Sequence, residues 1–97
     1  PYLEAIATYD EENDEIAVFA VNRSTDEKME LDISLLGFEG YRAVEFESMD
    51  GYDVYKENTF GDESVIMHQN PLPKVDGSSA VAELQPLSFN VLRFKKA

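Results

Sequence analysis

Apolar residues recur at every second position through much of this chain, a period typical of β-strands and not of helices. The clearest example runs from Met29 to Leu35, where apolar side chains alternate with two acidic residues and a serine. Such alternation places one face of a strand on a core and the other in water. Asp14 to Asn22 differs, because its six central residues are apolar without a break. This run predicts a strand that is covered on both faces.

A third strand is expected from Tyr41 to Met49. We place Val44 and Phe46 on one of its faces, and Glu45 and Glu47 on the other. A glycine precedes this segment and an Asp-Gly pair follows it. Both are typical turn formers, so they mark the two ends of the strand.

The remaining segments also favour short strands joined by loops. Tyr2 to Tyr9 fits both a strand face and a helical stripe, and we expect a strand because β neighbours follow directly and no helix cap precedes it. Ala80 to Leu84 and Ser88 to Phe94 are two further short strands. Between Gly51 and Ser79, turn residues predict long loops around one short strand near Val65 to Met67. About seven short strands with regular turns predict an all-β protein, an antiparallel β-sandwich.

Composition narrows the range of functions. The 97 residues can hold one core, and 43% of them are hydrophobic, which is enough to fill it. The net charge of −12 repels phosphate and anionic lipid, so we expect neither nucleic acid nor membrane as a partner. There is no cysteine, which excludes disulfides, thiolate metal sites and a cysteine nucleophile. No apolar run approaches the roughly 20 residues that span a bilayer, and a cytoplasmic location is expected.

Several groups of residues could carry chemistry. The acidic run from Asp10 to Glu15 offers oxygens for calcium, but it lacks the glycine that lets a calcium loop converge. Glu45 with Glu47, or Asp50 with Asp53, could be nominated as a glycosidase pair. On a strand, however, Glu45 and Glu47 point the same way into water, and no apolar pocket is indicated that would raise the pKa of either. We therefore expect no catalytic residue, no metal site and no cofactor.

A histidine and two tyrosines are further candidates for a functional site. His68 is the sole histidine, and its neighbours show no serine elbow for a catalytic triad, so we expect it at a strand end or in a loop. Tyr52 and Tyr55 follow Gly51 and could stack on sugar rings, although tyrosine is often held in a domain by its apolar body. Carbohydrate binding through these two tyrosines is therefore the functional alternative.

Several short segments follow one another in a characteristic order. The two with most weight are Phe19 to Arg23 and the closing Leu87 to Phe94. The supporting segments are Pro1 to Ala5, Tyr9-Asp10, Leu36-Gly37-Phe38 followed by Tyr41, and Asn58-Thr59. Together they resemble the C-terminal domain of glycoside hydrolase family 51, the α-L-arabinofuranosidases. The resemblance covers nearly the whole chain, and neither family motif around the two catalytic glutamates is present.

The resemblance implies that residues 1–97 form a single C-terminal domain of a larger glycoside hydrolase. In such an enzyme a (β/α)8 barrel of the same chain carries out retaining hydrolysis of terminal α-L-arabinofuranosyl residues in arabinose-containing glycans. The family's sandwich is jelly-roll-like and is completed by a strand from the enzyme's N-terminus, so one strand is expected to be missing here. The domain's role is then structural: it would pack on the barrel and help a homo-oligomer to form, and alone it would be inactive.

A domain taken from its barrel should also expose what the barrel covered. We expect an open sheet edge and an apolar patch, and self-association of the chain through one of them. Residues 1–63 carry a net charge of −14 and residues 64–97 a net charge of +2, as counted along the sequence. The nearly neutral segment from Ser64 to Phe94 is therefore the expected place of contact.

Overall fold

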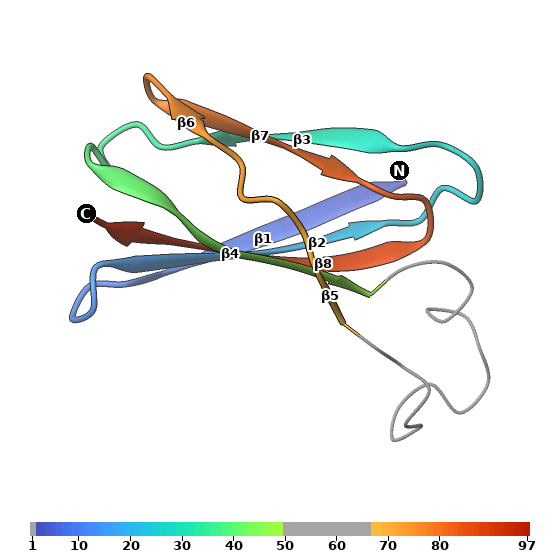
Figure 1. The fold of residues 1–97 in the computed structure, drawn as a ribbon, viewed down its shortest axis with the longest axis horizontal. Coiled ribbons are helices and arrows are strands. Elements are labelled where there is room, and N and C mark those ends of the chain that lie inside the picture. The colour runs from blue at the N-terminus through green and yellow to red at the C-terminus, as the bar shows by residue number, and fades with distance from the viewer. Residues whose placement is uncertain (1, 50–66) are drawn as a thin grey trace.

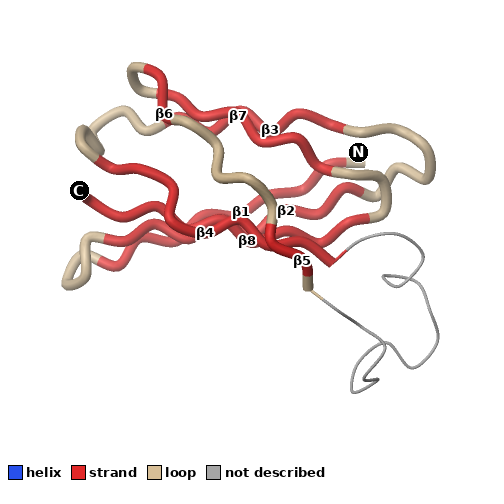
Figure 2. Tube along the Cα trace, viewed as in Figure 1, coloured by secondary structure: helices blue, strands red, loops and turns tan. Residues whose placement is uncertain are grey.

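The computed structural model describes residues 2–49 and 67–97, and it consists of strands and turns (Figure 2). In this described part no helix occurs, and so none that could cross a membrane. The strands are β1 (Leu3–Asp10), β2 (Glu15–Asn22), β3 (Met29–Ser34), β4 (Tyr41–Met49), β5 (His68–Gln69), β6 (Val75–Asp76), β7 (Ser79–Leu84) and β8 (Ser88–Lys96). The predicted all-β class is confirmed.

The strands form two sheets that lie face to face (Figure 1). One sheet has five strands in the order β1-β2-β8-β4-β5, and the other has three in the order β3-β7-β6. Every strand pair is antiparallel. The expected antiparallel β-sandwich is therefore confirmed, and β2 and β8 lie inside the larger sheet as their apolar sequences require.

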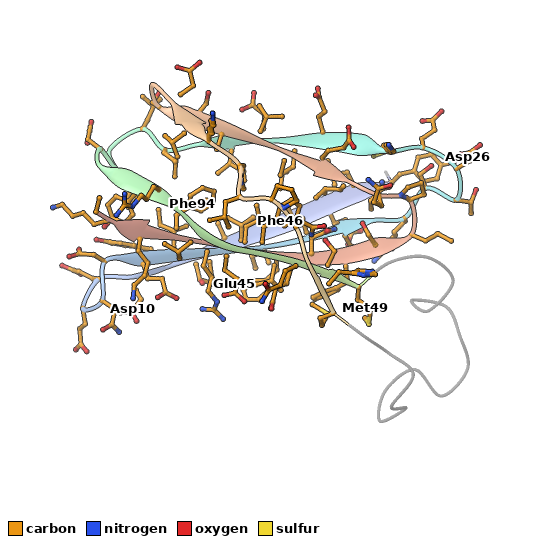
Figure 3. All side chains as sticks on the ribbon, viewed as in Figure 1. Asp10, Asp26, Glu45, Phe46, Met49 and Phe94 are labelled. Atoms are coloured by element: carbon orange, nitrogen blue, oxygen red, sulfur yellow. The ribbon has the colours of Figure 1, made fainter. Side chains whose placement is uncertain are left out.

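The core lies between the two sheets. Its most deeply buried side chains include Leu84, Leu92 and Phe94, each with 0% of its surface exposed. Figure 3 shows Phe46 and Phe94 between the sheets, with Glu45 and Met49 on the opposite side of the five-stranded sheet. The alternation predicted for Met29 to Leu35 is also present. Its apolar residues are buried or half-buried, and the two acidic residues and the serine between them are exposed. The period-two pattern thus decides which side chains enter the core.

One prediction about β4 is wrong. Val44 was placed on the same face as Phe46, but Val44 is 44% exposed and Phe46 only 7%. The cause is a β-bulge. Ala43 pairs with Phe94 and Glu45 pairs with Arg93, so Val44 is an extra residue without a partner in β8. A bulge reverses the alternation beyond it, because one residue is added to one strand only. Glu45 and Glu47 do share a face, as predicted.

At one end of the sandwich the core is polar. Asn22, Ser88 and Asn90 are at most 1% exposed, although they lie between the sheets. Asn90 accepts a 2.6 Å hydrogen bond from the hydroxyl of Ser48 and donates to the carbonyl of Ala20 and to the hydroxyl of Ser88. No buried side-chain nitrogen or oxygen of the described residues lacks a hydrogen-bond partner. Polar groups can be buried here because every one is satisfied.

The remaining elements were predicted with mixed success. Tyr2 to Tyr9 is a strand, as expected, and becomes β1. The short strand expected near Val65 to Met67 lies mostly outside the described residues; Met67 is not in a strand, and β5 begins one residue later. β6 was not predicted, because two residues are too few for a periodic pattern to show.

Candidate functional site

The acidic run Asp10 to Glu15 forms the turn between β1 and β2. The Asp10 carboxylate accepts hydrogen bonds from the backbone N–H groups of Glu12 and Asn13 and from the Asn13 side chain, the last at 2.7 Å. These hydrogen bonds lower the pKa of Asp10 below its usual value, with the Asn13 side chain as the largest cause. The oxygens of Asp10 are thus used in closing the turn, and the described residues contain no group of ligands that could hold a metal ion.

The outer side of the five-stranded sheet carries a cluster of charges around Arg93. Its guanidinium binds two carboxylates, Glu15 at 2.8 Å and Glu45 at 2.7 Å. The hydrogen bond with Glu15 is the largest of the causes that raise the pKa of Arg93. Lys95 adds a looser contact with Glu15 at 3.7 Å. Register explains the grouping, because these residues come from the neighbouring strands β2, β8 and β4 and point to the same face.

Glu45 and Glu47 are one of the two carboxyl pairs considered above for glycosidase chemistry. The neighbouring Glu45 side chain is the largest cause that raises the pKa of Glu47, and burial and the negative charge of Glu45 add to the shift. This shift was not expected from the sequence, although its main cause lies on the same strand. The geometry is nevertheless wrong for a glycosidase. The two side chains lie next to each other on one face of β4, and Arg93 holds the Glu45 carboxylate at 2.7 Å, so the pair does not face across a space for a sugar as two catalytic carboxyls must.

The raised pKa of Glu47 gives a test of this arrangement. A carboxyl whose pKa is higher in the folded state contributes stability below its unfolded pKa, and this stability is lost as the pH rises through the folded value. Glu47→Gln is therefore expected to raise the urea midpoint relative to the wild type at pH 7. The gain should disappear as the pH falls below the ordinary pKa of a glutamate.

Glu30→Gln is the matched control, because it also removes one negative charge from an exposed strand position. Urea unfolding of both variants between pH 4 and pH 8 separates the local effect from the relief of general repulsion, since the change in net charge is the same. Equal gains in the urea midpoint, with equal pH dependence, would show that the contact with Glu45 does not control the pKa of Glu47.

The other nominated residues do not form a site. His68 is exposed in the two-residue strand β5, close to the strand-end position that was expected. Asp50, Asp53, Tyr52 and Tyr55 lie outside the described residues. Among the residues that the structure describes, no catalytic constellation is therefore assembled.

The clearest unusual feature is an open groove between β1 and β3. β3 is the edge of the three-stranded sheet, and in the described part of the chain no strand pairs with its free side. β1 belongs to the larger sheet, and all of its residues after Leu3 are exposed. The groove between the two strands is largely apolar and has a volume of about 160 Å³. Its lining comprises Ala7, Thr8, Tyr9, Ile16, Val18, Ile33, Ser34, Leu35 and Phe38.

Three aromatic rings close one end of this groove. The ring of Phe38 makes edge-to-face contacts with Tyr9 at 5.1 Å and with Tyr41 at 5.3 Å between centroids. The hydroxyl of Tyr41 donates to Asp14 at 3.3 Å and lies 3.5 Å from the hydroxyl of Tyr9. The contact with Tyr9, burial and the charge of Asp14 together raise the pKa of Tyr41 above its usual range. The alternation in β1 predicts that Ala5, Ala7 and Tyr9 share a face, but only the fold shows that no strand of the described residues covers this face.

Comparison with curated proteins gives clear relatives. The chain is 38% identical over 96 residues to the intracellular exo-α-(1→5)-L-arabinofuranosidase 1 of Bacillus subtilis (strain 168). It is 34% identical over 96 residues to the intracellular exo-α-(1→5)-L-arabinofuranosidase of Halalkalibacterium halodurans. Each match covers 99% of this chain and 19% of the relative. The chain therefore spans about a fifth of the length of these relatives.

Solved structures agree on the fold. A family 51 α-L-arabinofuranosidase from Bifidobacterium longum has a TM-score of 0.73 at 20% identity, over 97% of this chain and 18% of that one. A family 44 xyloglucanase from Paenibacillus polymyxa has a TM-score of 0.74 at 14% identity, over 98% of this chain and 17% of that one. No protein-family model matches the chain. With the relatives above, the resemblance expected from the sequence is confirmed: over nearly its whole length this chain matches a domain-sized part of the α-L-arabinofuranosidases of glycoside hydrolase family 51.

Proposed function

We propose that this chain is the non-catalytic C-terminal domain of an intracellular α-L-arabinofuranosidase, and that it stabilises the catalytic barrel of the same polypeptide. The observation that carries the proposal is the match of 99% of this chain to only 19% of enzymes with that name. The names of these relatives also favour a cytoplasmic enzyme that removes terminal α-(1→5)-linked arabinofuranosyl residues from arabinose-containing glycans.

The chemistry of the described residues supports a structural role. Retaining hydrolysis needs an acid and a nucleophile on opposite sides of a sugar. Glu45 and Glu47 lie next to each other on one face of β4, and Glu45 is bound by Arg93 at 2.7 Å. We therefore assign both catalytic carboxyls to the rest of the enzyme, at the C-terminal face of its barrel.

We further propose that the parent polypeptide fills the groove between β1 and β3 with an extended segment. A strand paired with β3 would satisfy its free edge and cover the inward face of β1 in one step. The groove lining is apolar enough to bury alternate side chains of such a strand. This completes the sandwich in the way that the family resemblance led us to expect.

Hydrolysis of an aryl α-L-arabinofuranoside tests the assignment. The longer polypeptide that contains this chain is expected to release the aryl group, and the 97-residue chain alone is expected to release none. Turnover by the chain alone that disappears on a single Asp or Glu substitution would overturn the proposal. So would a longer polypeptide that is folded but inactive on this substrate.

Carbohydrate binding by Tyr52 and Tyr55 is the alternative proposal. It is supported by the ability of exposed aromatic faces to stack on sugars, and both residues lie outside the described part of the chain. Titration of the chain with arabinan oligosaccharides should give no saturable signal if the role is purely structural. A saturable signal that Tyr52→Ala or Tyr55→Ala removes would favour the alternative.

A further inference from the structure

We infer that the apolar half of the outer face of the five-stranded sheet is the surface by which this domain packs on the rest of its enzyme. The inference rests on the proposed function, and it adds the contact face and the character of the surface that meets it. It concerns a different part of the molecule from the groove, which lies on the inner side of the same sheet.

Strand register defines the surface. Cross-strand partners lie on the same face, so the pairing Ile6–Phe19–Val91 forms one row and Val21–Phe89–Met49 forms the next. We call these six residues the outer patch. Ile6 is 65% exposed and Phe89 37%, and the other four are partly exposed. Two adjacent rows of large apolar side chains therefore face water together.

The outer patch also contains a depression. Its volume is about 350 Å³, and it is lined by Glu4, Ala5, Ile6, Phe19, Val21 and Phe89. Apolar anchors that fill such hollows are the usual centres of protein interfaces. A projecting apolar side chain from a partner would fit this position.

The opposite outer face of the sandwich is built for water. On the three-stranded sheet, β3 presents Glu30 and Asp32 outward and β7 presents Glu83. Val81 is the exposed apolar residue of these rows at 49% exposure, and it lines a hollow together with Pro71 and Pro73. Single exposed apolar residues are common on soluble proteins, whereas contiguous patches mark sites of interaction. The two outer faces thus differ in kind, and only the face of the five-stranded sheet offers a continuous apolar surface in the described part of the chain.

The occupant is best identified as the remainder of the same polypeptide. About four-fifths of the length of the curated relatives lies outside the part that this chain matches. A second copy is a poorer fit, because each copy carries a net charge of −12 and two copies face to face would repel. The partner surface should be apolar at its centre and free of excess negative charge at its rim.

The border of the patch suits such a contact. The row with Val91 continues to Glu47 on β4, and the row with Val21 continues to Glu4 on β1, so each row ends at a carboxylate. The next row along β8 holds Arg93, which binds Glu15 and Glu45. Paired and hydrogen-bonded charges can be brought next to a partner with less loss than free ones. The charged cluster would then lie at the edge of the interface, where solvent still reaches it.

Cysteine labelling tests the inference when the label is located by mass spectrometry of the peptides of this chain, since the chain has no cysteine of its own and any label in it is on the introduced residue. I6C lies on the outer patch, and V81C is its matched control on the outer face of the other sheet, also exposed and in the middle of a strand. Each variant is made in the longer polypeptide, and the rate of reaction with a maleimide is compared before and after unfolding in urea. I6C should react at least about tenfold more slowly when folded, because the interface must open first. V81C should react at nearly the same rate in both conditions.

Equal reactivity of the two folded variants, or protection of V81C in place of I6C, would overturn the inference. Protection of I6C that falls on dilution would also overturn it, because a second copy would then be the occupant. These failures are distinguishable from failure of the proposed function, since arabinofuranosidase activity of the same preparations is measured separately and does not depend on which outer face is covered.

Discussion

Asn22→Asp is expected to unfold much of this domain at neutral pH. The Asn22 side chain is 1% exposed, and its amide nitrogen donates to the carbonyls of Glu27, Leu84 and Gln85 at 2.9, 3.1 and 3.0 Å. An aspartate of the same shape has no N–H and places a negative charge against these oxygens. The two N–H groups of Asn22 are shared among the three carbonyls, and loss of each N–H costs about 1–3 kcal/mol. An unpaired buried charge adds several more. The sum is comparable to the roughly 5–15 kcal/mol that stabilises a whole domain.

The effect should depend on pH in a defined direction. Burial against carbonyl oxygens favours the protonated carboxyl, which can donate one hydrogen bond, so part of the stability should return as the pH falls. Urea unfolding followed by far-UV circular dichroism measures this. Asn13→Asp is the control in the exposed turn after β1; it loses the hydrogen bond to Asp10 and adds a charge beside that carboxylate, but water solvates both groups, so it should lower stability much less than Asn22→Asp. Equal, small losses in both variants would show that the Asn22 hydrogen bonds do not hold the end of the sandwich together.

The polar end of the core was not predicted from the sequence, for a physical reason. Asn22 was placed only at the end of an apolar strand, and nothing local marks it as buried. Its partners Leu84 and Gln85 lie more than 60 positions away, and a buried amide is tolerated only when such distant partners are present. The bulge at Val44 was missed for a similar reason, because no glycine marks it and only pairing with β8 reveals the extra residue.

Patterns that depend on a single strand were predicted well. Alternation from Met29 to Leu35 follows from the single covered face of β3, and the sequence records this directly. The unbroken apolar run in β2 was predicted to be covered on both faces, but in the described residues Phe19 and Val21 on its outer face are partly exposed. The turn at Asp10 to Glu15 likewise needs only local interactions, because short-range hydrogen bonds accepted by one aspartate are enough to close it. The pKa of Glu47 is raised mainly by Glu45 on the same strand and lowered by Arg93 of β8 and Gln69 of β5, so the balance between them needed the structure.

An extended segment of the parent enzyme is expected to change the behaviour of β3 strongly. In an antiparallel strand, alternate N–H groups point to opposite sides. One set of β3 amides therefore faces β7, and the other faces the open groove, where the described residues provide no strand to accept from them. Amides of the second set should exchange with solvent deuterium quickly in the 97-residue chain. In the longer polypeptide a paired strand should slow them by about 100-fold or more, because exchange then requires local opening.

The open groove also explains why the isolated chain is expected to self-associate. The free edge of β3 can pair with a strand of another copy, although β3 lies outside the segment from Ser64 to Phe94 that the sequence predicted as the place of contact. The net charge of −12 opposes this association, and salt weakens the repulsion because it screens charges beyond about 8 Å. Sedimentation of the chain should therefore show more association at high salt than at low salt. Exchange must accordingly be measured at a concentration where the chain is monomeric.

Hydrogen exchange of β3 in the two forms tests most directly whether this chain is a domain that the rest of its enzyme completes. The β7-facing amides of β3 are the internal control, since they are paired in both forms. The expected result is fast exchange of the groove-facing amides in the chain alone and strong protection of the same amides in the longer polypeptide. Equal exchange of these amides in both forms would contradict completion of the sandwich by the parent enzyme.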